Sequence, residues 1–234
     1  MNADGKIEIE RKYAVGADFA MPDLSGVPAV ASVTGPRTYQ LTAVYWDTPG
    51  FRLAEAHITL RRRTGGTDAG WHLKLPAGAE RREVHAPLEA GTDRAGVGAE
   101  RGGGESTVPA ELTGLVSGVT GGLPLRPIAR LQTARTVRHL RDDAGQVLAE
   151  VADDQVTGSL PEPDGAAVSW QVASTWREVE VELDQGSADL LAATRPLLLA
   201  AGAQPSPAAS KLSNLLTTAG ALPGGTDRRS PHPG

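Results

Sequence analysis

Charged and apolar side chains alternate in KIEIERKYAV, residues 6–15, near the start of the chain. Successive side chains of a β-strand point to opposite faces of the sheet, so this alternation predicts a strand. One face would carry Glu8, Glu10 and Lys12, and the other would carry the two isoleucines and Arg11. Both faces contain charge, so this segment alone leaves open which face lies inside.

Further alternating segments, separated by turn signals such as GGTDAG at 65–70, predict a mainly β protein of the α+β class. Strands are expected at 38–47, 57–64, 71–76, 80–88, 129–141, 146–160 and 169–186. Helices or helical turns are expected at 22–31, 51–56, 108–119, 187–202 and 208–219. Many strands joined by short turns favour an antiparallel sheet or barrel with helices at its periphery.

The periodic segments fall within residues 1–219, which we interpret as one domain. The apolar share of 40% is sufficient for a core, while 28 glycines and 17 prolines indicate many turns. Residues 90–107 are Gly-rich and polar, which predicts a mobile loop. Residues 220–234 combine Gly, Pro and charge without periodicity, so we expect a disordered tail.

Charge and composition exclude several classes of protein. The formal net charge of −5 and the pI near 5.6 argue against general nucleic-acid binding. The absence of cysteine excludes disulfides and thiolate metal sites. No apolar run approaches ~18 residues, and the N-terminus lacks the apolar core of a signal peptide. We therefore expect a cytoplasmic protein without a membrane partner.

Charged rows recur on strands far apart in the sequence, opposite the apolar rows of the same strands. The acidic rows are Glu150 with Asp154, and Glu178 with Glu180 and Glu182; the basic rows are Arg61 with Arg63, and His72 with Lys74. Taken one strand at a time, a solvated face explains such rows as well as an interior does. Like charges ~6.6 Å apart cost under ~1 kcal/mol in water but ~2.5 kcal/mol at an effective dielectric constant of 20, so a confined interior needs counterions.

If these strands close a barrel, its interior is charged and its apolar rows face outward under helices. The carboxylates would then bind a divalent cation through oxygen. The arginines and lysines would bind a polyanion, because guanidinium groups match phosphate oxygens. Carboxylates without cysteine and with few histidines favour Mg²⁺ or Mn²⁺ over zinc. A phosphate chain bridged to the protein by such a metal meets both requirements.

The order of these motifs resembles that of the CYTH superfamily, the triphosphate tunnel metalloenzymes. EIERK at 8–12 matches the E-x-E-x-K signature, and YWDTPGFRLAEAHITLRRR at 45–63 resembles the Y-x-D-T…L-R-x-R segment. WHLKLP, TARTV, EVADD, EVEVEL and the SK pair at 210–211 follow in the family order. The resemblance covers about residues 5–217. It is greatest to the CYTH portion of bacterial CYTH–CHAD proteins, so a CHAD domain in a longer parent chain is a predicted partner.

The resemblance implies an eight-stranded, closed, antiparallel β-barrel that hydrolyses a triphosphate with Mg²⁺ or Mn²⁺. The implied metal ligands are Glu8, Glu10, Glu150, Asp154, Glu178 and Glu180. The implied phosphate-binding residues are Lys12, Arg61, Arg63, Lys74, Arg81, Arg135 and Lys211. The implied catalytic residues are Lys12, Glu178 and Glu180. Glu83, Arg130 and Glu182 match the family pattern less closely.

Three functions remain open from the sequence. The favoured one is a triphosphatase acting on inorganic tripolyphosphate or a short polyphosphate, because few aromatic side chains are free to stack on a base. Thiamine triphosphate and nucleoside triphosphates are the other substrates. A class IV-type adenylate cyclase would instead direct the 3′-hydroxyl of ATP onto the α-phosphorus. A polyphosphate-binding module would bind without turnover, and the filled acidic positions argue against it.

Overall fold

The computed structural model describes residues 6–78, 80–88, 107–162 and 168–221. Its strands are β1 (Lys6–Glu8), β2 (Glu10–Val15), β3 (Ser32–Val33), β4 (Arg37–Asp47), β5 (Thr59–Thr64), β6 (Gly70–Ala77), β7 (Glu80–Ala86), β8 (Arg126–Arg141), β9 (Val147–Pro161), β10 (Trp170–Leu183) and β11 (Gln204–Pro205). Its helices are α1 (Arg52–Glu55), α2 (Ala110–Thr120), α3 (Ala188–Ala200) and α4 (Lys211–Thr218). None of these described helices is long and apolar enough to span a bilayer. The predicted mobile loop and disordered tail fall almost wholly outside the described residues.

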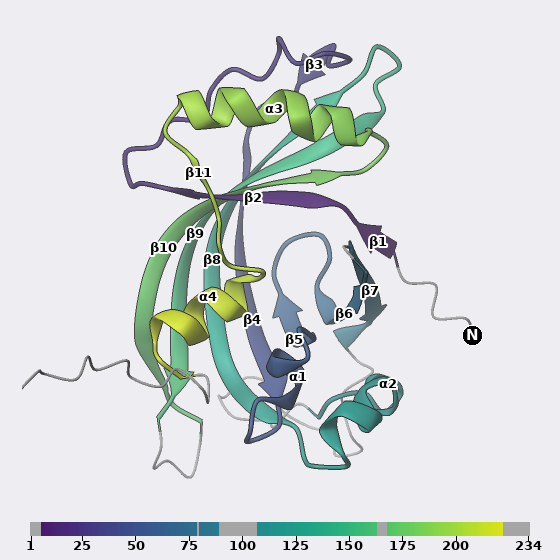
Figure 1. Ribbon diagram of the computed structural model, residues 1–234, viewed down its shortest axis with the longest axis vertical. Coiled ribbons are helices and arrows are strands. Elements are labelled where there is room, and N and C mark those ends of the chain that lie inside the picture. Colours follow the sequence, from purple (N-terminus) through teal and green to yellow (C-terminus); the bar gives the residue numbers. More distant parts are fainter. Residues whose placement is uncertain (1–5, 79, 89–106, 163–167, 222–234) are drawn as a thin grey trace, which may run out of the picture.

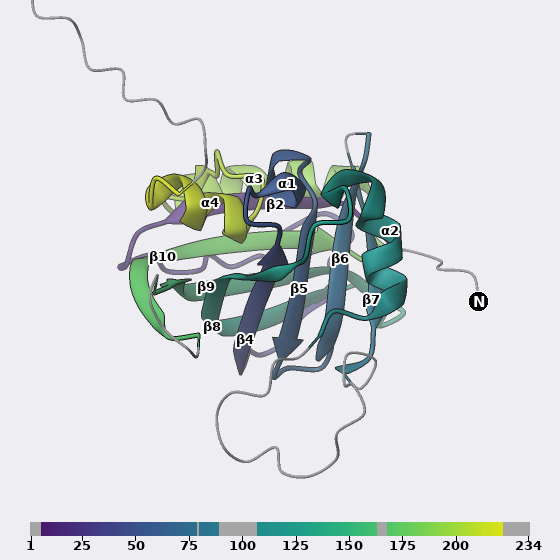
Figure 2. The same ribbon diagram turned by 90° about the horizontal axis from the view of Figure 1, so that it is seen from below.

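One curled antiparallel sheet contains all the described strands (Figures 1 and 2). Its order is β1-β7-β6-β5-β4-β8-β9-β10-β2-β11, and β3 pairs with β8 outside this path. Figure 2 shows the strands from β10 to β7 side by side across one curved surface. The prediction of a mainly β, antiparallel fold is confirmed. The prediction of a closed, eight-stranded barrel is wrong, since the described sheet is a curled half-barrel with ten strands along its path.

The N-terminal segment changes pairing partner within the strand predicted at 6–15. β1 pairs with β7, which places Glu8 opposite Arg81, and β2 pairs with β10, which places Lys12 opposite Glu180. A single residue, Ile9, separates the two short strands. The N-terminal segment therefore pairs with strands from both ends of the run from β7 to β10. This pairing brings residues from distant parts of the strand order beside the N-terminal acidic row.

The segment expected to be helical at 22–31 forms turns instead. The N–H of Val27, for example, donates to the carbonyl of Leu24 at 3.2 Å, and the chain then enters β3. Pro22 and Pro28 give the physical reason, because each proline disfavours the α conformation at the residue before it. The other predicted helices and strands form within a few residues of their expected bounds.

The apolar rows of the strands pack outward beneath helices, as expected. Val179 and Val181 of β10 are fully buried in a cluster with Leu190, Leu191 and Leu198 of α3. A second cluster joins the apolar rows of β5, β6 and β7 to α1 and α2. Burying such a side chain stabilises the fold by ~1.5–3 kcal/mol. The apolar rows are therefore the main source of folding free energy, and the charged rows are left for the opposite face.

Helix α4 is the exception to the expectation that the helices are peripheral. Leu215 and Leu216 pack with Val156 and Trp176, on the same face of the sheet as the charged rows. Gly158 makes room for this contact, because a Cβ atom there would lie 2.7 Å from a methyl group of Leu215. In Figure 1, α4 lies within the curve of β8, β9 and β10. It fills one part of the concave face, and the charged rows occupy the rest.

Candidate functional site

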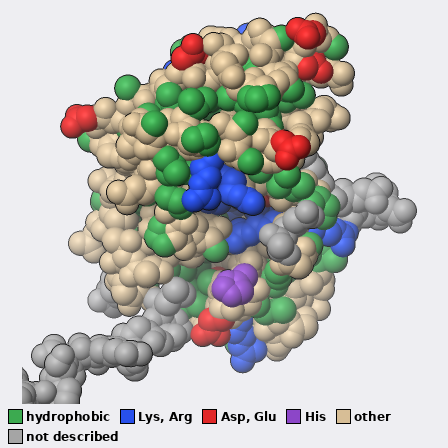
Figure 3. All heavy atoms as spheres, turned by 45° about the horizontal axis from the view of Figure 1, so that its top comes forward, with side chains coloured by type: hydrophobic (Ala, Val, Ile, Leu, Met, Phe, Trp, Pro, Cys, Tyr) green, Lys and Arg blue, Asp and Glu red, His purple; other side chains and the backbone are tan. Residues whose placement is uncertain are grey.

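The charged rows line a cavity of about 1040 Å³ on the concave side of the sheet. Figure 3 shows Lys and Arg side chains gathered in a hollow near the middle of one face. The predicted site residues in its lining are Glu8, Glu10, Lys12, Arg61, Arg63, Lys74, Arg81, Arg135, Glu150, Glu180 and Lys211. Glu83, Glu182 and His72 also line it. The structure thus brings together residues from both ends of the chain.

Three residues that the sequence singled out lie outside this lining. Asp154 and Glu178 lie behind it and are almost completely buried. The neighbouring Asp153 instead pairs with Arg177 at 2.8 Å. Arg130 stacks on Trp170, with its guanidinium carbon 5.3 Å from the ring centroid.

Lys211 enters the cavity from the first turn of α4. Ser210 caps this helix through a capping box, in which two serine hydroxyls accept hydrogen bonds from backbone N–H groups. The Lys211 Nζ lies 2.9 Å from Asp154 and 2.7 Å from both Glu178 and Glu180. One ammonium group therefore contacts three buried carboxylates.

Arg135 of β8 completes this ion-paired group. Its Nε and Nη2 donate to Asp154 at 2.8 and 2.7 Å, and Nη2 also donates to Glu180 at 2.7 Å. Lys12 donates to Glu180, and its Nζ lies 3.0 Å from Glu10. Burial alone would raise the pKa of Glu180, but the surrounding cations hold it well below its usual value. The pKa of Asp154 is lowered in the same way. Both carboxylates are therefore ionised.

The basic side of the cavity has fewer partners within the protein. Arg61 and Arg63 point from one face of β5. Within the described residues, the hydrogen-bond partner of Arg61 is the Tyr45 hydroxyl, 3.5 Å from Nη1, and the buried Nε has none. Arg63 forms an ion pair with Asp68. Because a guanidinium group presents its donors in a fork that matches phosphate, this side is suited to an anion.

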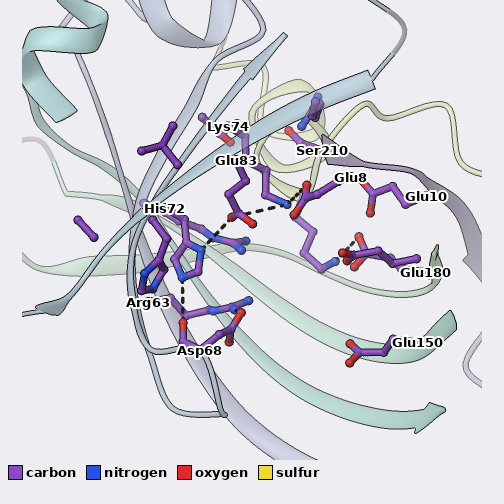
Figure 4. Close-up of a pocket in the computed structure, with 18 of the residues that line it drawn as sticks. Glu8, Glu10, Arg63, Asp68, His72, Lys74, Glu83, Glu150, Glu180 and Ser210 are labelled. Carbon is purple, nitrogen blue, oxygen red and sulfur yellow. Dashed lines mark hydrogen bonds and ion pairs between the residues drawn. The ribbon is translucent and has the colours of Figure 1, made fainter. Parts of the chain in front are cut away.

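Polar contacts link the N-terminal acidic row to the basic side (Figure 4). Lys74 donates to Glu8 at 2.6 Å, and the Nδ1 of His72 lies 2.8 Å from Glu83. The Nε2 of His72 lies 2.9 Å from the backbone carbonyl of Asp68. Burial raises the pKa of Glu8 to about 7 and lowers the pKa of His72 to about 4. Glu8 therefore exchanges its proton near neutral pH.

The sequence did not predict Tyr45 and Asp68 as residues of this site, and it gave Glu83 only as a weaker candidate. Glu83 lies opposite Lys74 in the β6–β7 ladder, so strand alternation contained the signal for it. Tyr45 lies opposite Arg61 in the β4–β5 ladder, but an aromatic residue gave no reason to expect a polar role. Asp68 lies in the predicted turn between two strands, where periodicity carries no information on direction.

The buried carboxylates fit a divalent cation. One oxygen each from Asp154, Glu178 and Glu180 lies within 4.8 Å of the others. A donor set of oxygen alone suits Mg²⁺ or Mn²⁺. Glu8 and Glu10 offer further carboxylate oxygens from the cavity lining. The first three carboxylates already contact cationic side chains, so a metal ion would replace some of these ion pairs.

The fold and the cavity together define a class of protein: a curled antiparallel sheet that encloses fixed carboxylates and fixed cations on its concave side. The family model for the CYTH domain matches residues 6–208. The chain therefore belongs to the CYTH domain family.

Two curated relatives match most of the chain. Two uncharacterized proteins of Mycobacterium tuberculosis, Rv2226 of strain H37Rv and MT2285 of strain CDC 1551, are 42% identical over 229 residues. The match covers 94% of this chain and 42% of each relative, so the chain spans less than half of their length. None of these matches tests the predicted CHAD partner.

Two solved structures resemble this chain at low sequence identity. A candidate adenylate cyclase from Bacillus halodurans is 16% identical with a TM-score of 0.53, covering 90% of this chain and 98% of that one. A candidate adenylyl cyclase from Hippeastrum, described as having a dominant triphosphatase activity, is 14% identical with a TM-score of 0.49, covering 90% and 95%. The likeness to the Bacillus halodurans structure shows a shared fold.

Proposed function

We propose that this chain hydrolyses a triphosphate, with inorganic tripolyphosphate as the favoured substrate. The observation that carries the proposal is the asymmetry of the cavity. Its buried carboxylates have cationic partners in the protein, whereas the hydrogen-bond partner of Arg61 among the described residues is a hydroxyl group. A chain of phosphates supplies the missing negative charge. No described Trp or Phe lines the cavity, which favours an inorganic chain over a nucleoside triphosphate.

The proposed reaction is attack by water on a terminal phosphorus. The bond from that phosphorus to the bridging oxygen breaks, a carboxylate accepts the proton of the water, and tripolyphosphate yields orthophosphate and pyrophosphate. The proposed phosphate-binding residues are Lys12, Arg61, Arg63, Lys74, Arg81, Arg135 and Lys211. Their fixed positive charges stabilise the charge that develops on the transferred group.

The proposed metal ligands are Glu8, Glu10, Glu150, Asp154, Glu178 and Glu180. A bound Mg²⁺ or Mn²⁺ supplies Lewis acidity and lowers the pKa of a coordinated water. Lys12 donates a hydrogen bond to Glu180 in the cavity lining, where the two side chains can orient a phosphate and a water molecule. Glu178 lies behind the lining, 2.7 Å from the Nζ of Lys211, so it can also position that lysine.

A small substrate panel separates this proposal from the alternatives. Product analysis should use tripolyphosphate, thiamine triphosphate and ATP, each with Mg²⁺ and with Mn²⁺. Orthophosphate release from tripolyphosphate is the expected result. Formation of cyclic AMP and pyrophosphate from ATP would support the cyclase instead. Calorimetric binding of polyphosphate without any product would support a binding module.

The variant Glu10→Gln tests the metal requirement. It removes one carboxylate ligand, so phosphate release with Mg²⁺ should fall by about a hundredfold or more. It also removes one charge from a crowded acidic row, so the free energy of unfolding should change by less than about 1 kcal/mol. Glu55→Gln, the same change at an exposed position of α1, is the control. Wild-type activity with an unchanged metal requirement in Glu10→Gln would contradict the metal role.

A further inference from the structure

The loop between β5 and β6 brings a surface carboxylate back to a cation of the cavity. Asp68 belongs to this loop, residues 65–69, and forms an ion pair with Arg63. The Asp68 side chain is 56% exposed, whereas the Arg63 side chain is 7% exposed. The Arg63 guanidinium is therefore held in the interior. The Asp68 carboxylate can turn into solvent, where water solvates its charge.

Contacts other than the ion pair also determine the position of this loop. The Asp68 carbonyl lies 2.9 Å from the Nε2 of the buried His72. Gly65 and Gly66 have φ angles of +79° and +73°, which side-chain-bearing residues rarely adopt. At Gly70, a Cβ atom would lie 2.2 Å from a nitrogen of His85. The hairpin is thus built to place Asp68 beside the cavity.

The geometry points to Asp68 as a residue that sets selectivity for anion length, by competing with phosphate for Arg63. This inference rests on the proposed function insofar as it takes a phosphate chain as the ligand. Among the described residues, Asp68 is the carboxylate paired with Arg63, while Arg61 and Arg135 add positive charge nearby. An anion that takes the Nη2 of Arg63 must therefore displace Asp68.

Displacement of Asp68 from Arg63 depends on the length of the phosphate chain, because the Asp68 carboxylate is tethered to the protein. A tethered group acts at a high effective concentration, which a free orthophosphate in solution does not match. A phosphate at the end of a chain is different, because the other proposed phosphate-binding residues, Arg61 among them, hold the rest of that chain. Its own effective concentration near Arg63 is then comparable with that of Asp68. Short anions are penalised more than long ones.

Calorimetry with Asp68→Asn tests this competition without turnover. Orthophosphate and tripolyphosphate would be titrated in the absence of divalent metal. We expect orthophosphate to bind Asp68→Asn about three- to tenfold more tightly than wild type, and tripolyphosphate less than about threefold more tightly. Asp143→Asn removes the same charge from an exposed turn and should behave as wild type. Equal affinities in Asp68→Asn and Asp143→Asn would overturn the inference.

A second background separates competition from a general electrostatic effect. In Arg63→Ala, the further change Asp68→Asn should leave orthophosphate affinity unchanged, because the contested cation is gone. A gain of the same size in that background would show that Asp68 acts only through its charge, and would overturn the inference.

Failure of the inference is distinguishable from failure of the proposed function. Hydrolysis of tripolyphosphate without any effect of Asp68→Asn on binding would retain the function and reject the competition. The expected affinity changes without hydrolysis would do the reverse. No binding of tripolyphosphate by any variant would reject both.

Discussion

The two sides of the cavity hold their buried charges in different ways. Lys211 has three carboxylate partners between 2.7 and 2.9 Å, and Arg135 shares two of them. Arg61 is equally enclosed by the sheet, yet its partner among the described residues is a hydroxyl group. Among the described residues, Lys211 is neutralised by carboxylates in direct contact, whereas Arg61 forms no ion pair.

This difference separates charges that hold the site together from charges that await a ligand. Burying ions is costly, and a buried pair recovers the cost only when partners and hydrogen bonds are in place. Loss of one partner on the Lys211 side leaves several carboxylates without compensation. Arg61 forms no ion pair with a described carboxylate, and Glu83, the carboxylate near it, keeps its contacts with His72 and Lys74 when Arg61 is lost. Stability should therefore depend on the first side, and anion affinity on the second.

The largest effect is expected for Lys211→Met, which removes the shared cation. Asp154, Glu178 and Glu180 would then lie buried with too little positive charge. Breaking a buried ion pair in this way typically costs about 3–5 kcal/mol in the free energy of unfolding. Urea unfolding in metal-free buffer measures the change. Arg61→Met is the matched control and should cost less than about 1 kcal/mol, so equal losses in the two variants would contradict the comparison.

Arg61→Met should have the next largest effect, now on binding. Charge-assisted hydrogen bonds to phosphate contribute about 1.5–3 kcal/mol, so tripolyphosphate affinity should fall roughly ten- to hundredfold. Orthophosphate affinity should fall less, because a single phosphate can occupy another cation of the cavity. Added salt should weaken wild-type binding more steeply than the variant's. Calorimetry with both anions measures these changes, and equal losses for both would mean that Arg61 holds only one end of the ligand.

Strand alternation was sufficient to predict which site residues share a face, and the family resemblance implied that this face lies inside. The period of two puts Arg61 beside Arg63 and Glu178 beside Glu180 whatever the partner strands are. The helix that covers Val179 and Val181 was also predictable, because an apolar row must be buried somewhere. The roles of these residues in catalysis remain predictions.

Three features could not be read from local patterns. The change of partner at Ile9 depends on which strands reach the N-terminal segment, which is a property of the whole sheet. The inward position of α4 depends on the space beside Gly158, a tertiary contact. The contact of Asp68 with Arg63 depends on the direction in which a glycine-rich turn folds. All three are long-range geometry, whereas alternation reports only on neighbours along one strand.

The last expected effect is on the pH dependence of stability, because the protein lowers the pKa of Glu180 and raises the pKa of Glu8. Burial raises the pKa of Glu8 from 4.5 to about 7, so the folded state holds this proton more tightly than the unfolded state. The resulting stabilisation is present below about pH 4.5 and is lost as the pH rises through about 7. Glu8→Gln cannot lose a proton, so its stability relative to wild type should rise from near zero at about pH 4.5 to about 3 kcal/mol at about pH 8. Urea unfolding across this range, in metal-free buffer and with Glu55→Gln as the control, measures the difference. A stability difference that does not change with pH would mean that Lys74, 2.6 Å away, keeps Glu8 ionised in the folded protein. Glu8 would then resemble Glu180, which the surrounding cations also keep ionised.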